Sequence, residues 1–415
     1  MFTTGQETSM AEKKKNKKKW IYKRHMVVRH TLGPFFRLYS RIKYGARIRR
    51  FKEEGKRQYL VLFNHTTAFD QFFVALSFRQ HLYFIASEDI FSKGFLSDAL
   101  RYLVAPIPIK KQTTDVRAIM NCMRVAKEGG SISLAPEGNR TYSGKTEYMS
   151  PSIAPLARKL GLPIVLYHIK GGYGVQPRWA DTVRKGRMDC YVSRVIEPEE
   201  YLQLTDDELY TLIKDGLYIN EANADNTFRH KRRAEHLERV IYYCPDCGFS
   251  EFETDRDVIR CKRCGLSARY LPTTELEGTH RDLPYRFVND WYEAQAEYIN
   301  SVDLTALTDT PVFVDVASFS EVIPYKKKRP IADGCRVSLY GDRITVEADG
   351  VSEIFSFKEC SAVTVLGRNK VDIYFGDKIY QLKGEKCMNG IKYVHFFNRY
   401  KNIVKGDENG KFLGL

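Results

Sequence analysis

Short apolar runs and amphipathic segments alternate along the chain from about residue 59 onward. The apolar runs have the length and composition of buried strands: YLVLF (59–63), LYFIAS (82–87), SISLAP (131–136) and PIVLYHI (163–169). Strands that alternate with amphipathic helices are typical of α/β layer folds. We therefore predict an α/β domain, a mixed sheet flanked by helices, over residues 59–240.

The segments between the apolar runs carry helix signals. DQFFVALSFRQ begins at Asp70, a residue type that can cap a helix. TTDVRAIMNCMRVAKEGG ends near Gly129, and four of its apolar residues share one helical face: Val116, Ile119, Met120 and Met123. Both segments are therefore predicted to be helices of the α/β layer.

The pattern changes in the second half of the chain. Residues 241–268 contain two Cys-x2-Cys pairs, and residues 269–330 predict a helical connector and first strands. Residues 331–415 contain short strands, a closing helix and turn signals at Gly341-Asp342, Asp349-Gly350 and Gly376-Asp377. We predict a small all-β domain there, and its architecture resembles a pleckstrin-homology-like (PH-like) domain.

The positive charge is concentrated at the N-terminus. The net charge is +15, and the first 50 residues hold 15 Lys and Arg against only Glu7 and Glu12, which is +13 of that total. Such an arm suits an anionic membrane surface or nucleic acid. Because large apolar and aromatic residues lie among the charges, we predict that residues 1–58 are a basic amphipathic membrane-binding arm. A solvated tail followed by an ordinary surface helix is the alternative.

The chain shows neither a transmembrane span nor a secretory signal, because no uncharged stretch approaches about 20 apolar residues and the lysines precede no apolar core. Of the nine cysteines, four form a cluster and five are scattered singly, which is typical of a reducing compartment. We therefore expect a peripheral or monotopic protein on the cytoplasmic face of a membrane.

An imidazole and a carboxylate follow the first predicted strand. In VLFNHTTAFD, the apolar run stops at Asn64, His65 follows it, and Asp70 lies five positions after His65. If the chain turns into a helix between them, the carboxylate can accept the imidazole N–H and fix its tautomer, which leaves the other nitrogen as a general base. On this spacing alone, a structural histidine is the competing interpretation.

A second polar loop follows the strand SISLAP. In SLAPEGNRTYSG, Gly138 allows close approach of a ligand to the backbone, and Arg140 offers a planar fork that suits phosphate. Glu137 can orient that fork or a substrate hydroxyl. An ordinary polar turn with a surface ion pair is the alternative.

Together these stretches resemble the glycerolipid acyltransferase family, the lysophosphatidic acid acyltransferases in particular. The resemblance rests on NHTTAFD, which matches an N-H-x4-D block, on PEGNR about seventy residues later, and on the apolar stretch GLPIVLYHI. It covers about residues 30–220 and implies transfer of an acyl group from acyl-CoA or acyl carrier protein to lysophosphatidic acid, giving phosphatidic acid in phospholipid biosynthesis.

The resemblance also implies roles for single residues. His65 would be the general base and Asp70 its orienting partner, with no catalytic cofactor. Asn64, Glu137, Gly138 and Arg140 would bind the lysophospholipid acceptor.

One stretch departs from the family pattern. The family usually has an arginine where this chain has APIPIKKQ, so Lys110 or Lys111 would meet the phosphate. Because of this substitution, the acceptor can also be a lysolipid other than lysophosphatidic acid. The Gly-rich stretch at 170–179, which contains Arg178, is a further candidate for the headgroup site, or only a turn.

The clustered cysteines predict a metal site. Cys244, Cys247, Cys261 and Cys264 form two Cys-x2-Cys pairs, each followed by glycine. This spacing is typical of a structural zinc held by four thiolates in a zinc ribbon.

A lysine arm together with a zinc ribbon also suits a basic nucleic-acid-binding protein. Outside the arm, however, the charge is nearly balanced, and that function leaves both acyltransferase blocks unexplained. A non-catalytic lipid-binding scaffold is a further alternative. We therefore expect a peripheral membrane acyltransferase with no nucleic-acid partner.

Overall fold

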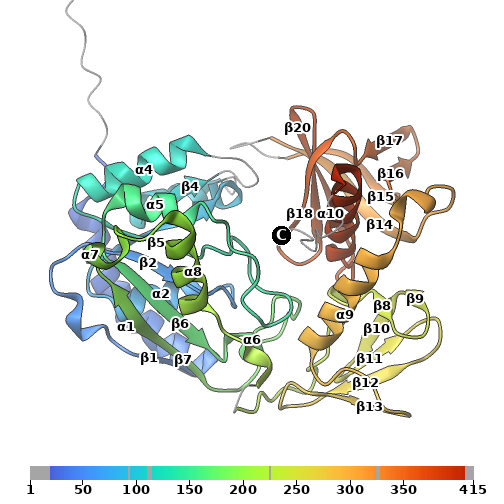
Figure 1. The fold of residues 1–415 in the computed structure, drawn as a ribbon, viewed down its shortest axis with the longest axis horizontal. Helices are drawn as coiled ribbons and strands as arrows, with labels where there is room; N and C mark the ends of the chain where they lie inside the picture. Colours follow the sequence, from blue (N-terminus) through green and yellow to red (C-terminus); the bar gives the residue numbers. More distant parts are fainter. Residues whose placement is uncertain (1–18, 92–93, 110–114, 224–225, 324–327, 407–415) are drawn as a thin grey trace, which may run out of the picture.

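The computed structural model describes residues 19–91, 94–109, 115–223, 226–323 and 328–406. Figure 1 shows an α/β part in blue and green, a small β part in yellow and a C-terminal β part in orange and red. A long helix, α9 (Val288–Ser301), lies between the last two parts.

A seven-stranded sheet forms the centre of the α/β part, in the order β1-β7-β6-β2-β5-β3-β4. Neighbouring strands are parallel except β6 and β7, which are antiparallel, so the predicted mixed sheet is confirmed. The strands are β1 (Ala46–Ile48), β2 (Leu60–Phe63), β3 (Leu82–Ser87), β4 (Ile107–Ile109), β5 (Ser131–Leu134), β6 (Ile164–Lys170) and β7 (Met188–Ile196).

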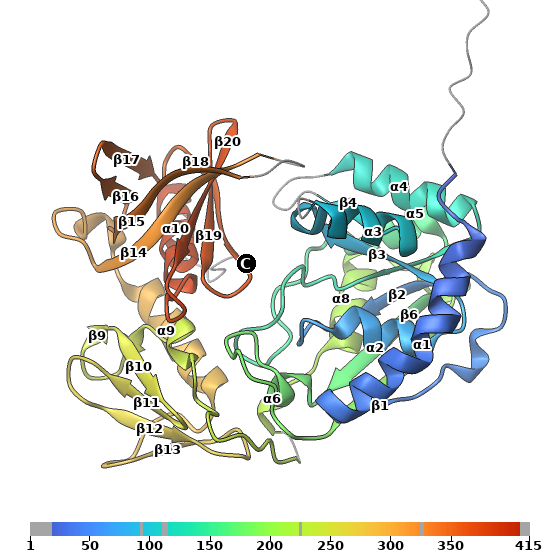
Figure 2. The same cartoon turned by 180° about the vertical axis from the view of Figure 1, so that it is seen from behind.

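Helices cover both faces of this sheet (Figures 1 and 2). Alternate residues of β2 show why: Leu60 and Leu62 pack into one core, while Val61 and Phe63 pack into the other. The first core lies under α4, α5 and α8, and the second under α1 and α2. The helices are α1 (Lys23–Tyr44), α2 (Asp70–Ser77), α3 (Phe95–Leu103), α4 (Val116–Lys127), α5 (Ile153–Leu160), α6 (Gly172–Val175), α7 (Pro198–Tyr201) and α8 (Asp206–Leu217). Short 3-10 helices lie at Lys52–Glu54, Glu88–Phe91, Glu221–Asn223, Leu237–Arg239 and Leu304–Ala306.

The N-terminal segment contributes to the α/β part more than we predicted. Strand β1 pairs with β7, and α1 is tied to the strand and to α2, for example by the Arg29 Nε bond to the Ala75 carbonyl (3.0 Å). The predicted arm at 1–58 is therefore not a separate unit over its described part, since its buried residues, such as Tyr44, join the second core. Residues 1–18 lie outside the described chain.

Helix α4 does not bury the shared apolar face that the sequence shows. Ala118, Cys122 and Val125 are its buried residues, whereas Val116, Met120 and Met123 of the predicted face are exposed. Small residues of α4 pack against the sheet, so the longer apolar side chains of the helix face outward. Among the described residues, none of the helices combines the length and apolarity needed to cross a membrane.

The cysteine-bearing part is larger than the predicted 241–268. A two-stranded sheet, β8 (Tyr243–Cys244) with β9 (Gly248–Phe249), precedes a four-stranded antiparallel sheet that ends at residue 278. That sheet contains β10 (Phe252–Asp255), β11 (Val258–Cys261), β12 (Ser267–Tyr270) and β13 (Leu276–Gly278). The predicted connector at 269–330 thus begins inside this sheet, although its helix is present as α9.

The C-terminal part is a seven-stranded antiparallel sheet in the order β17-β16-β15-β14-β20-β19-β18, with α10 (Ile391–Lys405) packed against β18. The strands are β14 (Phe313–Val322), β15 (Arg329–Leu339), β16 (Arg343–Ala348), β17 (Val351–Ser356), β18 (Cys360–Leu366), β19 (Lys370–Phe375) and β20 (Lys378–Gly384). All three predicted turns fall between strands. The predicted boundary at 330/331 cuts β15, so this part begins at β14.

The three parts share a hydrophobic core. Trp179 and Ala180 of the α/β part belong to the same buried cluster as Trp291 of α9 and Val363 of β18. The C-terminal part is therefore packed directly against the α/β part.

Candidate active site

Two neighbouring parallel strands carry the polar motifs to one edge of the sheet. Strands β2 and β5 pair in register, Leu62 opposite Leu134, so the loops that follow them start side by side. His65 lies in the first loop and Glu137 in the second. The carboxyl edge of a parallel sheet is where ligands bind in open α/β folds.

Asn64 fixes the start of the first loop. Its side-chain amide donates to the Ile169 carbonyl (3.0 Å) and accepts from the Ile169 amide (2.8 Å), so it extends the β2–β6 pairing by one residue. The residue is buried, and both polar atoms of its side chain are occupied. Asn64 therefore has a structural role, instead of the predicted contact with substrate.

His65 and Asp70 point toward each other as the spacing predicts. His65 Nδ1 lies 2.8 Å from Asp70 Oδ2; the imidazole side chain is 22% exposed, whereas the carboxylate is fully buried. This contact assigns the Nδ1–H tautomer, which leaves Nε2 with a free lone pair. No hydrogen-bond partner for Nε2 is present among the described residues.

Asp70 is held from the preceding loop. Its carboxylate accepts the Thr66 amide (2.6 Å), the Thr67 amide (3.0 Å) and the Thr67 hydroxyl (2.6 Å). Although Asp70 begins α2, the N-cap position is Phe69, so the carboxylate turns back to the loop and does not cap the helix as predicted. The loop amides and hydroxyl thus fix the carboxylate under the imidazole.

The electrostatic surroundings favour a neutral His65. Burial lowers the pKa of His65 below its usual 6.5, and the hydrogen bond and charge of Asp70 act in the opposite direction. The positive charges of Arg140 and Arg178 lower it further. At neutral pH the imidazole is therefore available as a base.

Glu137 connects the loops instead of facing a substrate. Its buried carboxylate accepts the His65 amide (2.8 Å) through Oε1 and the Glu147 amide (3.0 Å) through Oε2. Burial raises the pKa of Glu137 to about 8, against the effect of these two amides. We predicted a role in acceptor binding, but both oxygens are occupied, so the residue positions the backbone at His65.

Gly138 and Arg140 form the open side of the second loop. Gly138 has φ 70°, a left-handed conformation that favours glycine, and a Cβ there would meet no atom within 4 Å. Arg140 has a buried Nη1 without a hydrogen-bond partner. In the described chain no carboxylate forms an ion pair with Arg140, so its guanidinium is available to an anion.

Arg178 has a role that the sequence does not reveal. Its guanidinium is buried, lies 4.0 Å from the Tyr142 ring centroid, and donates to the Arg140 carbonyl (3.0 Å) and the Val365 carbonyl (3.2 Å). Arg178 therefore links the loop of Arg140 to β18 of the C-terminal part. Lys110 and Lys111, the predicted phosphate ligands, lie outside the described residues; β4 ends at the residue before them.

The four clustered cysteines meet in space. The Sγ atoms of Cys244, Cys247, Cys261 and Cys264 all lie within 4.8 Å of one another, and Cys244 and Cys264 are 3.6 Å apart. A zinc ion with Zn–S bonds of about 2.3 Å separates its sulfurs by about 3.8 Å, so the four thiols fit a tetrahedral ion. Backbone amides of Arg263 and Cys264 lower the pKa of Cys261, against the effect of burial.

A His–Asp pair on loops at the carboxyl edge of a mixed sheet, beside an unpaired arginine, defines the class of site. A family model described as Acyltransferase matches residues 41–170, which hold the His–Asp pair, Glu137 and Arg140. This segment is therefore an acyltransferase-like α/β domain, and the match supports an acyltransferase enzyme.

The known proteins to which the chain is similar include two acyltransferases. A chloroplastic 1-acyl-sn-glycerol-3-phosphate acyltransferase from Brassica napus is 25% identical over 122 residues, which is 29% of this chain and 35% of that protein. The chain therefore matches about a third of the length of this relative. A crystal structure of the 1-acyl-sn-glycerophosphate (LPA) acyltransferase from Thermotoga maritima superposes with a TM-score of 0.41 at 20% identity, over 46% of this chain and 78% of that one.

Proposed function

We propose that the protein transfers a fatty acyl group from an acyl thioester, acyl-CoA or acyl carrier protein, to the free hydroxyl of lysophosphatidic acid, and so forms phosphatidic acid. The observation that carries this proposal is the His65–Asp70 pair, with a neutral imidazole whose Nε2 has no hydrogen-bond partner among the described residues. The family match over residues 41–170 supports acyl transfer as the reaction.

The geometry supports a direct transfer. His65 Nε2 takes the proton of the acceptor hydroxyl while the hydroxyl oxygen attacks the thioester carbonyl. Asp70 stabilises the imidazolium that forms. When the tetrahedral intermediate collapses, the C–S bond breaks and the imidazolium returns the proton to the thiolate, so no covalent acyl-enzyme is required.

The acceptor carries a phosphate, and Arg140 supports its binding. A buried guanidinium nitrogen without a partner is costly unless a ligand pairs with it. A phosphate monoester provides such a partner, because it presents several acceptor oxygens to the planar guanidinium fork. The acceptor hydroxyl would then lie within reach of the loop that carries His65.

An exposed apolar stripe supports the proposed peripheral association with an anionic membrane. On α1, Phe35 is 64% exposed and Ile42 76% exposed, with Val27 and Leu38 on the same stripe. Helix α3, which contacts α1, also exposes a large apolar side chain, Phe95. Large apolar side chains among arginines and lysines are typical of helices that lie in the headgroup layer. Because the acceptor is a lipid, this surface would bring the site to its substrate.

We also propose that the cysteine cluster holds a structural zinc in a zinc ribbon. Four thiols within 4.8 Å of one another support this assignment. The strand order of the C-terminal sheet and its closing helix support a PH-like domain.

The experiment that tests the function offers labelled acyl-CoA and acyl carrier protein, with a panel of lysolipids, to the wild type and to His65→Ala. We expect transfer to lysophosphatidic acid that disappears in the variant. Transfer to another lysolipid would change the acceptor and keep the chemistry. Transfer that survives in His65→Ala would refute the mechanism.

A further inference from the structure

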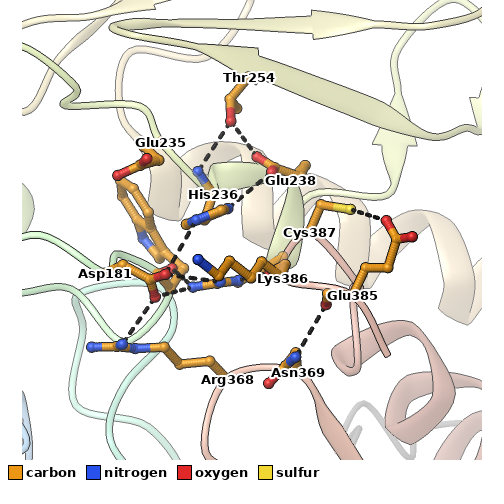
Figure 3. A network of polar contacts seen from close by, with 12 residues as sticks. Asp181, Glu235, His236, Glu238, Thr254, Arg368, Asn369, Glu385, Lys386 and Cys387 are labelled. Atoms are coloured by element: carbon orange, nitrogen blue, oxygen red, sulfur yellow. Dashed lines mark hydrogen bonds and ion pairs between the residues drawn. The ribbon is translucent and has the colours of Figure 1, made fainter. Parts of the chain in front are cut away.

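The turn between β18 and β19 brings an arginine of the C-terminal part to the α/β part. Arg368 Nη1 forms an ion pair with Asp181 Oδ1 (2.9 Å), and Figure 3 shows the side chain extending from the turn toward that carboxylate. The Arg368 side chain is 32% exposed, and the described residues give its guanidinium no further ion pair. The remaining nitrogens are therefore available for another anion.

The turn is held in a fixed conformation. Gly367 has φ 70°, which allows the chain to reverse there. Asn369 donates to the carbonyls of Gly384 (2.7 Å) and Glu385 (3.1 Å), so the turn is anchored to the end of β20. Arg368 is thus presented from a rigid turn.

Arg178 connects the turn that carries Arg368 to the loop of the acyltransferase domain that carries Arg140. Arg178 donates to the carbonyl of Arg140 in that loop and to the carbonyl of Val365 near the end of β18. Burial and the positive charges of Arg178 and Arg368 lower the pKa of Arg140 to about 10. Asp181 is shared with Arg239 (2.8 Å), so it does not neutralise the charges of Arg140, Arg178 and Arg368.

We infer that Arg368 joins Arg140 to bind the phosphate monoester of a substrate, so that the C-terminal β part completes the active site. Arg178 positions the loop of Arg140 and the β18 strand relative to each other. A phosphate monoester carries a charge of about −1.5 to −2 at pH 7 and accepts several bonds from guanidinium groups. Two substrates carry this group: the lysophosphatidic acid headgroup and the 3′-phosphate of CoA.

The first experiment measures binding without turnover. Glycerol 3-phosphate is titrated calorimetrically into the full chain, with glycerol as the phosphate-free control. We expect Arg368→Gln to weaken binding by about tenfold or more, because it loses a charge-assisted bond. Arg336→Gln removes the same charge from an exposed position on β15 and should bind like the wild type. Arg368→Lys should retain part of the affinity.

The second experiment locates the phosphate. With the proposed acyl transfer as the assay, we expect Arg368→Gln to raise KM more than it lowers kcat. If the effect of Arg368→Gln on KM disappears when monoacylglycerol replaces lysophosphatidic acid, the phosphate belongs to the acceptor. If it disappears when a 3′-dephospho-CoA thioester replaces acyl-CoA, the phosphate belongs to the donor. An effect that is equal with all of these substrates shows a purely structural role and overturns the inference.

The two proposals fail separately, although the inference takes its substrates from the proposed function. If the wild type binds glycerol 3-phosphate through Arg368 but transfers no acyl group, the function is refuted alone. If the wild type transfers the acyl group, but Arg368→Gln binds glycerol 3-phosphate like the wild type and shows no change in KM that depends on the phosphate of either substrate, the inference is refuted alone.

Discussion

Replacing Asp70 with asparagine removes a negative charge from the His65 imidazole while keeping the shape of the side chain. The asparagine oxygen can take the position of Oδ2 and keep the bonds from the His65 ring and from the amides of Thr66 and Thr67. Its nitrogen then lies at the position of Oδ1, where it can donate to the Thr67 hydroxyl. We therefore expect Asp70→Asn to fold with an almost unchanged Tm.

The cost to catalysis follows from the charge that develops on His65. With Nδ1 and Oδ2 2.8 Å apart, the centres of charge are about 4 Å apart, and a pair at that distance gains about 4 kcal/mol at an effective dielectric of about 20. The variant loses this stabilisation in the transition state only. We expect kcat/KM to fall by about 10³-fold.

The assay follows labelled acyl transfer from the thioester to lysophosphatidic acid, with Asp207→Asn, on an exposed position of α8, as the matched control. Because His65 must be neutral to act as a base, kcat/KM should rise with pH through a pKa below 6.5 and then level off. Asp70 raises that pKa, so its removal should move the rise to lower pH. A variant within threefold of the wild type, or a rise that moves to higher pH, would refute the reasoning.

Three further predictions test other parts of the structure. Glu137→Gln turns an amide nitrogen toward one of the two backbone donors that the carboxylate now accepts. We expect kcat to fall about tenfold and the free energy of unfolding to fall by about 1–3 kcal/mol, while KM for the acceptor stays unchanged. A raised KM without loss of stability would show that Glu137 binds the acceptor instead. By elemental analysis Cys261→Ser should lose about one equivalent of zinc, and its Tm should fall. Cys387→Ser, which lies outside the cluster, should keep its zinc and the Tm of the wild type. Phe35→Ser should weaken flotation with anionic vesicles about 30-fold, since burial of this side chain contributes about 2 kcal/mol. Ile354→Ser, which removes a similarly exposed apolar side chain on β17, should float like the wild type, and equal losses would contradict a specific membrane face.

Local patterns predicted those features that depend on neighbouring residues. The apolar run at β2 forms a strand because its alternate side chains fill two cores, and the glycine turns of the C-terminal sheet follow from backbone conformation. The His65–Asp70 contact needs only a strand, a loop and a helix start within six residues. The grouping of the four thiols was also predictable from local sequence, because each Cys-x2-Cys pair holds its two thiols close together.

Features that depend on distant packing were not predictable in this way. Helix α1 carries the charge of a free arm, yet its arginines bind carbonyls of α2, a contact that only the tertiary fold creates. Glu137 has the spacing of a ligand-binding residue, but its oxygens meet the amides of His65 and Glu147. Arg368 lies far from both motifs in the sequence, and no local signal connects its turn to Arg140.

The side chain of Arg239 links the α/β part to the C-terminal part. It donates to the Trp179 carbonyl (2.6 Å) and to Asp181 in the α/β part, and to the Lys386 carbonyl beyond β20. A chain cut at residue 240 would leave Trp179 exposed and would remove the Lys386 carbonyl from this cation. The α/β part is therefore not an autonomous folding unit. We expect heating to melt the whole chain in one cooperative transition. A fragment that contains only the NHTTAFD and PEGNR motifs should aggregate.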